Sequence, residues 1–189
     1  MLAEWANAAA ALTQTIQNNS LLVLEGIAVL MVIHLINWAL NYRLAILGIY
    51  PRHLSGLPGI IFSPFIHGSF NHLFFNSIPL FLLSSLLLAN GTHFFYELTW
   101  RLTVTCGALV WIFGRRGLHI GASGVIMAYF GYVLMQAYTN KSIEAILVAA
   151  LGLYYCGGLF SSLLPKEVKT SWEGHVMGFA AGIFWAFYF

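Results

Sequence analysis

The stretch HIGASGVIMAYFGY, residues 119–132, holds the feature that decides how this chain is interpreted. Ser123 stands between the small residues Gly121, Ala122 and Gly124, where a polar approach becomes an apolar run. Serine fills an apolar core poorly, and glycine disfavours a helix interior. The pattern therefore indicates a place that needs a bare hydroxyl group and a close approach of backbones.

The composition indicates an integral membrane protein. Of the 189 residues, 60% are hydrophobic and 7% are charged, whereas soluble domains carry about 25% charged residues. The net charge of +2 comes without a basic cluster, so nucleic-acid binding is not expected. Cys106 and Cys156 both lie in apolar runs, where they are expected to be small buried side chains and not a disulfide.

Six apolar stretches are long enough, or nearly so, to cross a bilayer core about 30 Å thick, which needs roughly 20 helical residues. The expected spans are residues 21–40, 72–89, 98–113, 121–138, 143–164 and 173–189. The predicted fold is an all-α membrane protein with six transmembrane helices. Residues 20–189 form its one domain, and residues 1–19 form a polar or interfacial segment before it.

The connection between the first two spans, residues 47–72, is expected to be structured. Pro51, Pro58 and Pro64 forbid one continuous helix, yet the sequence around Ile60 is too apolar for a free aqueous loop. Backbone that is not helical survives at membrane depth only inside protein or beside a wet cavity. We expect short helical turns that lie partly in the membrane interface.

Polar side chains inside the spans are costly and usually functional. They are Glu25, His34 and Asn37 in the first span, His72 and Asn76 in the second, Ser123 in the fourth, and His175 in the sixth. If the spans alternate in direction, the second, fourth and sixth all begin on one side of the membrane. Their polar residues are therefore predicted to meet at one level near that surface.

A serine hydroxyl is a weak nucleophile until a neighbouring base takes its proton, and His175 is the candidate base for Ser123. Glycines at four-residue spacing line the sixth span around this histidine, at positions 174, 178 and 182. Such stripes let transmembrane helices approach closely. The chain contains no aspartate, and Glu173 does not share the helix face of His175. A Ser–His dyad is expected.

His72 and Asn76 are four residues apart, so they share a helix face. Their neutral N–H groups are suited to stabilise the negative charge that develops on a carbonyl oxygen during acyl transfer. The backbone N–H of Ser123, at a helix N-terminus, would add a third donor.

Three motifs in this order carry a resemblance: HGSFNHLFFN (67–76), GASG (121–124) and GHVMGFAAG (174–182). With them the chain resembles the rhomboid intramembrane serine proteases of the bacterial six-span type, over residues 48–189. The resemblance implies a helical bundle with a water-filled cavity, and hydrolysis of transmembrane protein substrates among membrane lipids. No cofactor or metal is expected.

The resemblance also assigns roles to residues. It implies that Ser123 is the nucleophile and His175 the general base. His72 and Asn76 match the oxyanion-stabilising pair of the family. His67 matches a histidine that supports the site, and Gly121 is placed beside it as a second supporting residue. The chain departs from the family at Met127, where many members have an aromatic residue, and it lacks the Trp–Arg pair of the first loop.

The charges oppose the orientation that the family implies, with the active site on the outer side of a bacterial inner membrane. Lys and Arg should favour the inner loops. Instead the active-site side carries Arg43, Arg52, Arg115, Arg116, Lys166 and Lys169, and the other side Arg101 and Lys141. We follow the family orientation and treat some of the arginines as structural. Arg115 and Arg116 are interpreted as a solvated turn.

The sequence is compatible with two other functions. A catalytically silent rhomboid-like protein would bind transmembrane clients, but the Ser123, His175, His72 and Asn76 set argues against it. A metal site would use His67, His72, His119 and His175. No carboxylate or thiolate joins these histidines, and Asn76 is a poor zinc ligand.

Overall fold

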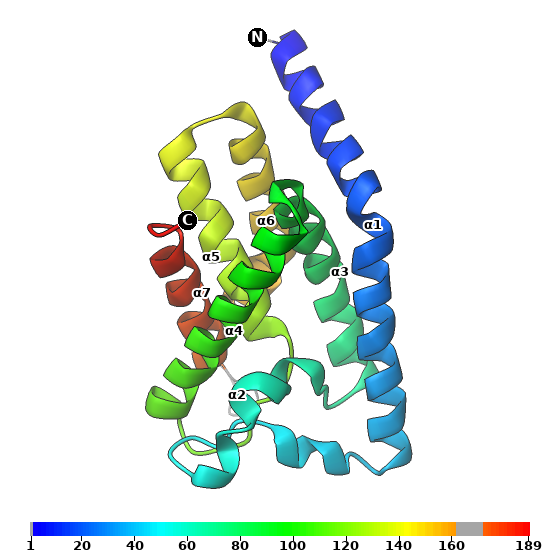
Figure 1. The fold of residues 1–189 in the computed structure, drawn as a ribbon, viewed down its shortest axis with the longest axis vertical. Helices are drawn as coiled ribbons and strands as arrows, with labels where there is room; N and C mark the ends of the chain where they lie inside the picture. The colour runs from blue at the N-terminus through cyan, green and yellow to red at the C-terminus, as the bar shows by residue number, and fades with distance from the viewer. Residues whose placement is uncertain (1, 162–171) are drawn as a thin grey trace.

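The fold consists of long helices joined by short connections, in a computed structural model that describes residues 2–161 and 172–189 (Figure 1). The long helices are α1 (Leu2–Ala39), α3 (Phe70–Leu87), α4 (Thr92–Phe113), α5 (Ser123–Asn140), α6 (Ile143–Ser161) and α7 (Trp172–Trp185). Within the described residues no strand forms, and the backbones of Ile49 and His119 make an isolated bridge. The starts of α3, α5 and α7 lie toward one end of the bundle, near the short helix α2.

The connection between α1 and α3 is built of short helical turns. They are η1 (Arg43–Leu47), η2 (Leu54–Gly56), α2 (Gly59–Phe62) and η3 (Ser63–Phe65), while η4 (Leu88–Asn90) follows α3. The backbone of Gly59 lies against that of Gly48, and a Cβ at Gly107 of α4 would lie 2.8 Å from the carbonyl oxygen of Ile60. These glycines allow close backbone contacts within the connection and between the connection and α4. Its place in a membrane interface remains a prediction.

Helices α1 and α4 begin well before the residues that the apolar pattern predicts. α1 starts at Leu2 and continues without a break through residues 19 and 20; at 1.5 Å per residue it is about 57 Å long, nearly twice the thickness of a bilayer core. α4 starts at Thr92 instead of near Leu98. The last residues of the expected fifth span, 162–164, lie outside the described residues, as do Lys166 and Lys169.

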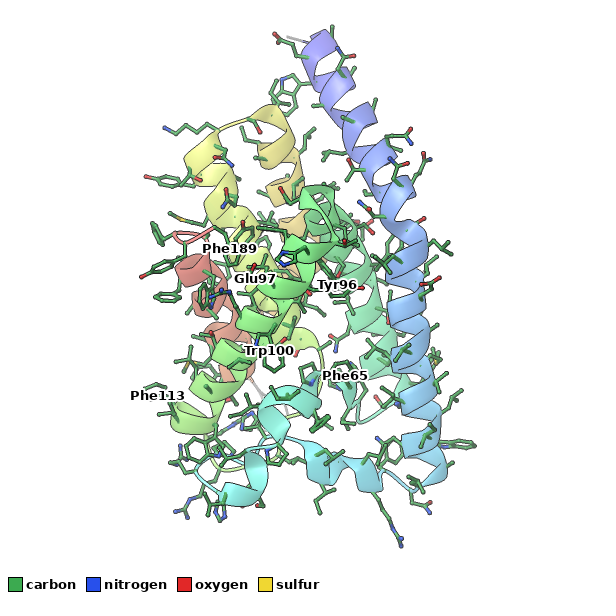
Figure 2. All side chains as sticks on the ribbon, viewed as in Figure 1. Phe65, Tyr96, Glu97, Trp100, Phe113 and Phe189 are labelled. Atoms are coloured by element: carbon green, nitrogen blue, oxygen red, sulfur yellow. The ribbon has the colours of Figure 1, made fainter. Side chains whose placement is uncertain are left out.

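The surface of the bundle is apolar where a soluble protein would be polar. Trp38 of α1 is 63% exposed, and Trp100 and Phe113 project from α4 (Figure 2) with 57% and 63% of their surface exposed. Soluble monomers rarely expose large contiguous apolar patches. Two segments, Leu2–Ala39 and Phe70–Asn90, are long and apolar enough to cross a membrane. The protein is therefore an integral membrane protein, and the crossing of the other helices remains a prediction.

Helix α5 lies at the centre and makes its most extensive contact with α7. Its residues from Ile126 to Phe130 are almost completely buried. Gly178 and Gly182 of α7 lie directly against the carbonyl oxygens of Gly124 and Ala128 of α5, without room for a side chain. The backbones of α5 and α7 are therefore in contact, as the glycine pattern predicts.

The far end of α7 is held by α4. The guanidinium group of Arg101 lies 4.8 Å from the ring centre of Trp185 and donates to Glu97 at 2.6 Å. The indole N–H of Trp185 donates to Thr105 Oγ1 at 2.9 Å. These contacts, on the side of the bundle where Glu97 and Phe189 lie close together (Figure 2), fix the end of α7 that is remote from His175.

Candidate active site

Ser123 is the first residue of α5 and is half-buried. The segment before it is held by the connection that follows α1, because Gly121 N–H donates to Ser63 O at 2.9 Å, and Ile49 and His119 exchange two backbone hydrogen bonds of 2.9 Å. Gly121 has a φ of +112°, a conformation that residues with a Cβ rarely adopt. The glycine before the serine is thus required by the turn that starts α5.

His72 and Asn76 lie on the α3 face that meets this turn. Ser69 caps α3 by accepting a hydrogen bond from His72 N–H at 3.1 Å. A Cβ built on Gly121 would lie 2.7 Å from His72 Nε2 and 3.6 Å from Asn76 Nδ2. The amide Nδ2 of Asn76 is buried and has no hydrogen-bond partner among the described residues. A buried donor without an acceptor is costly, so this amide is available to a group that enters the site.

His67 joins the same cluster from the loop before α3. It is fully buried, its ring centre lies 5.0 Å from that of His72, and its Nε2 accepts a hydrogen bond from Ala122 N–H at 3.4 Å. Burial, and then the nearby His72, lower the pKa of His67 to about 3. The ring is therefore neutral at physiological pH, as its acceptor role requires.

His175 approaches from α7 and is 5% exposed. Its neighbour Gly174 lies against Gly124, the residue after Ser123: a Cβ on Gly124 would be 3.3 Å from Gly174 O. Both helices start here, so the contact brings the ends that carry Ser123 and His175 together.

A small cavity borders the serine. Its volume is about 40 Å³, and Ser123, Gly121, Gly124 and Gly174 are among the residues that line it. By volume it has room for about two or three water molecules.

The structure thus places Ser123, His175, His72, Asn76, His67 and Gly121 in one region. His119 lies beside it and bonds through Nε2 to Arg115 O at 3.1 Å. Among the described residues no group of three or more His, Cys, Asp or Glu side chains is placed to hold a metal ion.

One supporting residue, Asn37 of α1, received no role from the sequence. It is 1% exposed, its Nδ2 donates to His67 O at 3.4 Å, and its Oδ1 accepts from Leu44 N–H at 3.1 Å. It therefore ties the loop of His67 to α1. The sequence did indicate that Asn37 has a role, because a polar side chain inside an apolar span is costly.

Arg115 is 40% exposed, as a solvated turn predicts, but it also makes an ion pair. Its Nε lies 2.9 Å from Glu173 Oε1, and the Glu173 side chain is only 5% exposed. Arg52, also counted among the charges on this side, donates to the carbonyl oxygens of Ile112 and Gly114 at 3.0 and 2.7 Å. Two of the arginines that oppose the expected orientation thus have structural partners.

A family model for the rhomboid domain matches residues 54–189. The chain belongs to the rhomboid family. The resemblance carried by the three motifs is confirmed, and the fold is the all-helical domain of that family. Members act on or bind membrane-protein segments within lipid.

Relatives with similar sequences are mycobacterial. An uncharacterized protein of Mycobacterium tuberculosis and one of Mycobacterium bovis are each 31% identical over 170 residues, which covers 85% of this chain and 71% of the relative. An uncharacterized protein of Mycobacterium leprae is 27% identical over 171 residues, 85% of this chain and 67% of the relative.

Proposed function

We propose that this rhomboid protein is an intramembrane serine endopeptidase that cleaves within or near transmembrane segments of other membrane proteins. The observation that carries the proposal is the contact between the starts of α5 and α7, which bear Ser123 and His175. A buried histidine and a half-buried serine at membrane depth are costly and usually functional.

In the proposed reaction Ser123 Oγ attacks the substrate carbonyl carbon while His175 takes the hydroxyl proton. The tetrahedral intermediate collapses as the C–N bond breaks, and the proton passes from His175 to the leaving amine. Water then attacks the acyl-serine ester, with His175 again as base, and releases the new carboxyl group and the serine. The cavity beside Ser123 provides space for that water.

The developing oxyanion is proposed to accept hydrogen bonds from Asn76 Nδ2, the His72 ring and the Ser123 backbone N–H. The unpartnered amide of Asn76 supports this assignment, because donors that are fixed before the charge appears stabilise it without reorganisation. Gly121 supports the site by letting the backbone pass close to His72.

We further propose that all six long helices cross a bacterial inner membrane, with the starts of α3, α5 and α7 on the outer side. The apolar outward surface and the common end of these three helices (Figure 1) support this arrangement.

The test is cleavage of a model transmembrane substrate, together with covalent labelling by a fluorophosphonate. Ser123→Ala should abolish both, and His175→Ala should abolish both while leaving Ser123 present, because members of a catalytic unit are individually indispensable. Labelling of His175→Ala at the parental rate would refute the dyad. A folded parent that binds the substrate but neither cleaves nor labels would instead indicate the silent, client-binding function.

A further inference from the structure

The ion pair between Arg115 and Glu173 joins the two segments that lead to the proposed dyad. Arg115 lies in the connection between α4 and α5, and Glu173 lies in the first turn of α7. The distance from Arg115 Nε to Glu173 Oε1 is 2.9 Å. No described residue donates a hydrogen bond to either Glu173 oxygen, so charge attraction to Arg115 compensates the buried carboxylate.

The Arg115 side of this pair is linked to Ser123 by backbone and side-chain contacts. The Nε2–H of His119 donates to Arg115 O at 3.1 Å, and the backbone of His119 is bonded in both directions to Ile49. Gly121, two residues further on, is bonded to Ser63. Arg115 is therefore part of the fixed frame from which α5 starts.

The Glu173 side of the pair belongs to the same helical turn as His175. Glu173 stands two residues before the histidine, and Gly174 between them is in contact with Gly124 of α5. The position of the Glu173 carboxylate is therefore coupled to that of the first turn of α7, which carries His175.

We propose that the Arg115–Glu173 pair holds the first turn of α7 in register with the start of α5, and that both are positioning residues for His175. The inference rests on the proposed proteolytic function. The pair does not replace the missing aspartate of a triad, because the carboxylate faces Arg115 and acts through the backbone of α7.

The unequal burial of the two side chains makes the proposal specific. The Glu173 side chain is 5% exposed and that of Arg115 is 40% exposed. Removing the arginine leaves a buried carboxylate without compensation, whereas removing the carboxylate leaves a cation that can turn toward water. Arg115→Gln should therefore be the more damaging variant, and a second substitution, Glu173→Gln, should reverse much of its effect.

The experiment compares the parent, Arg115→Gln, Glu173→Gln and the double variant, with Arg116→Gln as the matched control. Arg116 is the adjacent, exposed arginine. We expect kcat of Arg115→Gln to fall about tenfold or more at unchanged KM, with a parallel fall in the rate of fluorophosphonate labelling per folded molecule. Glu173→Gln should lower kcat by a smaller factor, because it removes the attraction without leaving an unpaired buried charge. The double variant should match Glu173→Gln, and the control should be as active as the parent.

Hydrogen exchange of the backbone amides from Gly174 to Met177 supplies a measurement that does not need activity. Exchange should be fastest in Arg115→Gln, and the double variant should exchange at the lower rate of Glu173→Gln. A parent without turnover or labelling would refute the proteolytic function. The exchange pattern would still show whether the Arg115–Glu173 pair holds the first turn of α7. Unchanged exchange in Arg115→Gln, or a double variant as impaired as Arg115→Gln, would overturn the inference.

Discussion

Gly178→Ala tests whether the backbone contact between α5 and α7 sets the geometry of the active site. A Cβ added at Gly178 would lie 2.9 Å from the carbonyl carbon and 3.3 Å from the Cα of Gly124, and closer still to its carbonyl oxygen. Carbon atoms prefer separations of about 3.5–4.0 Å, so the carbonyl carbon alone requires α7 to withdraw by roughly 0.6–1 Å, and the closer carbonyl oxygen requires no less. The displaced turn begins three residues after His175.

A misplacement of about 1 Å costs on the order of 10²-fold in rate, so kcat of Gly178→Ala should fall by about that factor. Overpacking should also lower stability by about 1–3 kcal/mol, which leaves a folded fraction to assay. The measurements are kcat on a transmembrane substrate and melting temperature, both on purified protein in detergent.

The matched control is Gly26→Ala in α1, where an added Cβ meets no atom within 4 Å. Alanine is the better helix former by about 1 kcal/mol, so this variant should be as active as the parent and no less stable. If Gly178→Ala keeps kcat within threefold of the parent, or if Gly26→Ala loses as much, the argument from backbone contact is refuted.

Two further predictions concern the oxyanion site and the topology. Asn76→Ala should lower kcat by about 10²–10³, or roughly 3–4 kcal/mol. Its melting temperature should change little, because Asn76 Nδ2 has no partner to lose among the described residues. The control is Ser77→Ala, and equal losses of activity in both variants would remove Asn76 from the site. In a Cys156→Ala background, a cysteine at position 116 should react with a membrane-impermeant thiol reagent in intact cells, and a cysteine at position 140 should not. The reverse pattern would place the active site on the cytoplasmic side.

The helices that the sequence predicted best are those whose apolar runs end at polar residues, glycine or proline. The predicted start of α6, Ile143, matches the structure, and that of α7 is one residue away. The start of α4 lies before the predicted Leu98, and the helix includes Glu97. In the structure Glu97 is bonded to Arg101, one helical turn away, and a pair at this spacing supports a helix interior.

The residues that the sequence could nominate for the site are those with chemistry in their side chains. Ser123, His175, His72 and Asn76 were nominated because reactive or polar groups at membrane depth need a reason. The partners of Asn37 and Arg115 could not be predicted. The contact of Asn37 with His67 spans 30 residues along the chain, and that of Arg115 joins the α4–α5 connection to the first turn of α7. Pairings of that kind depend on how helices pack, which local pattern does not determine.

The two sides of the site are therefore held by different forces. On the α3 side, hydrogen bonds made with Asn37, Ser69 and Ala122 position the loop and the histidines. Such bonds tolerate adjustments of a few tenths of an ångström. On the α7 side, glycine backbones touch α5 with no intervening side chain, so a single methyl group must move the helix. Substitutions that displace His175 are thus expected to act mainly on kcat through α7, whereas the oxyanion side should respond to the loss of individual donors.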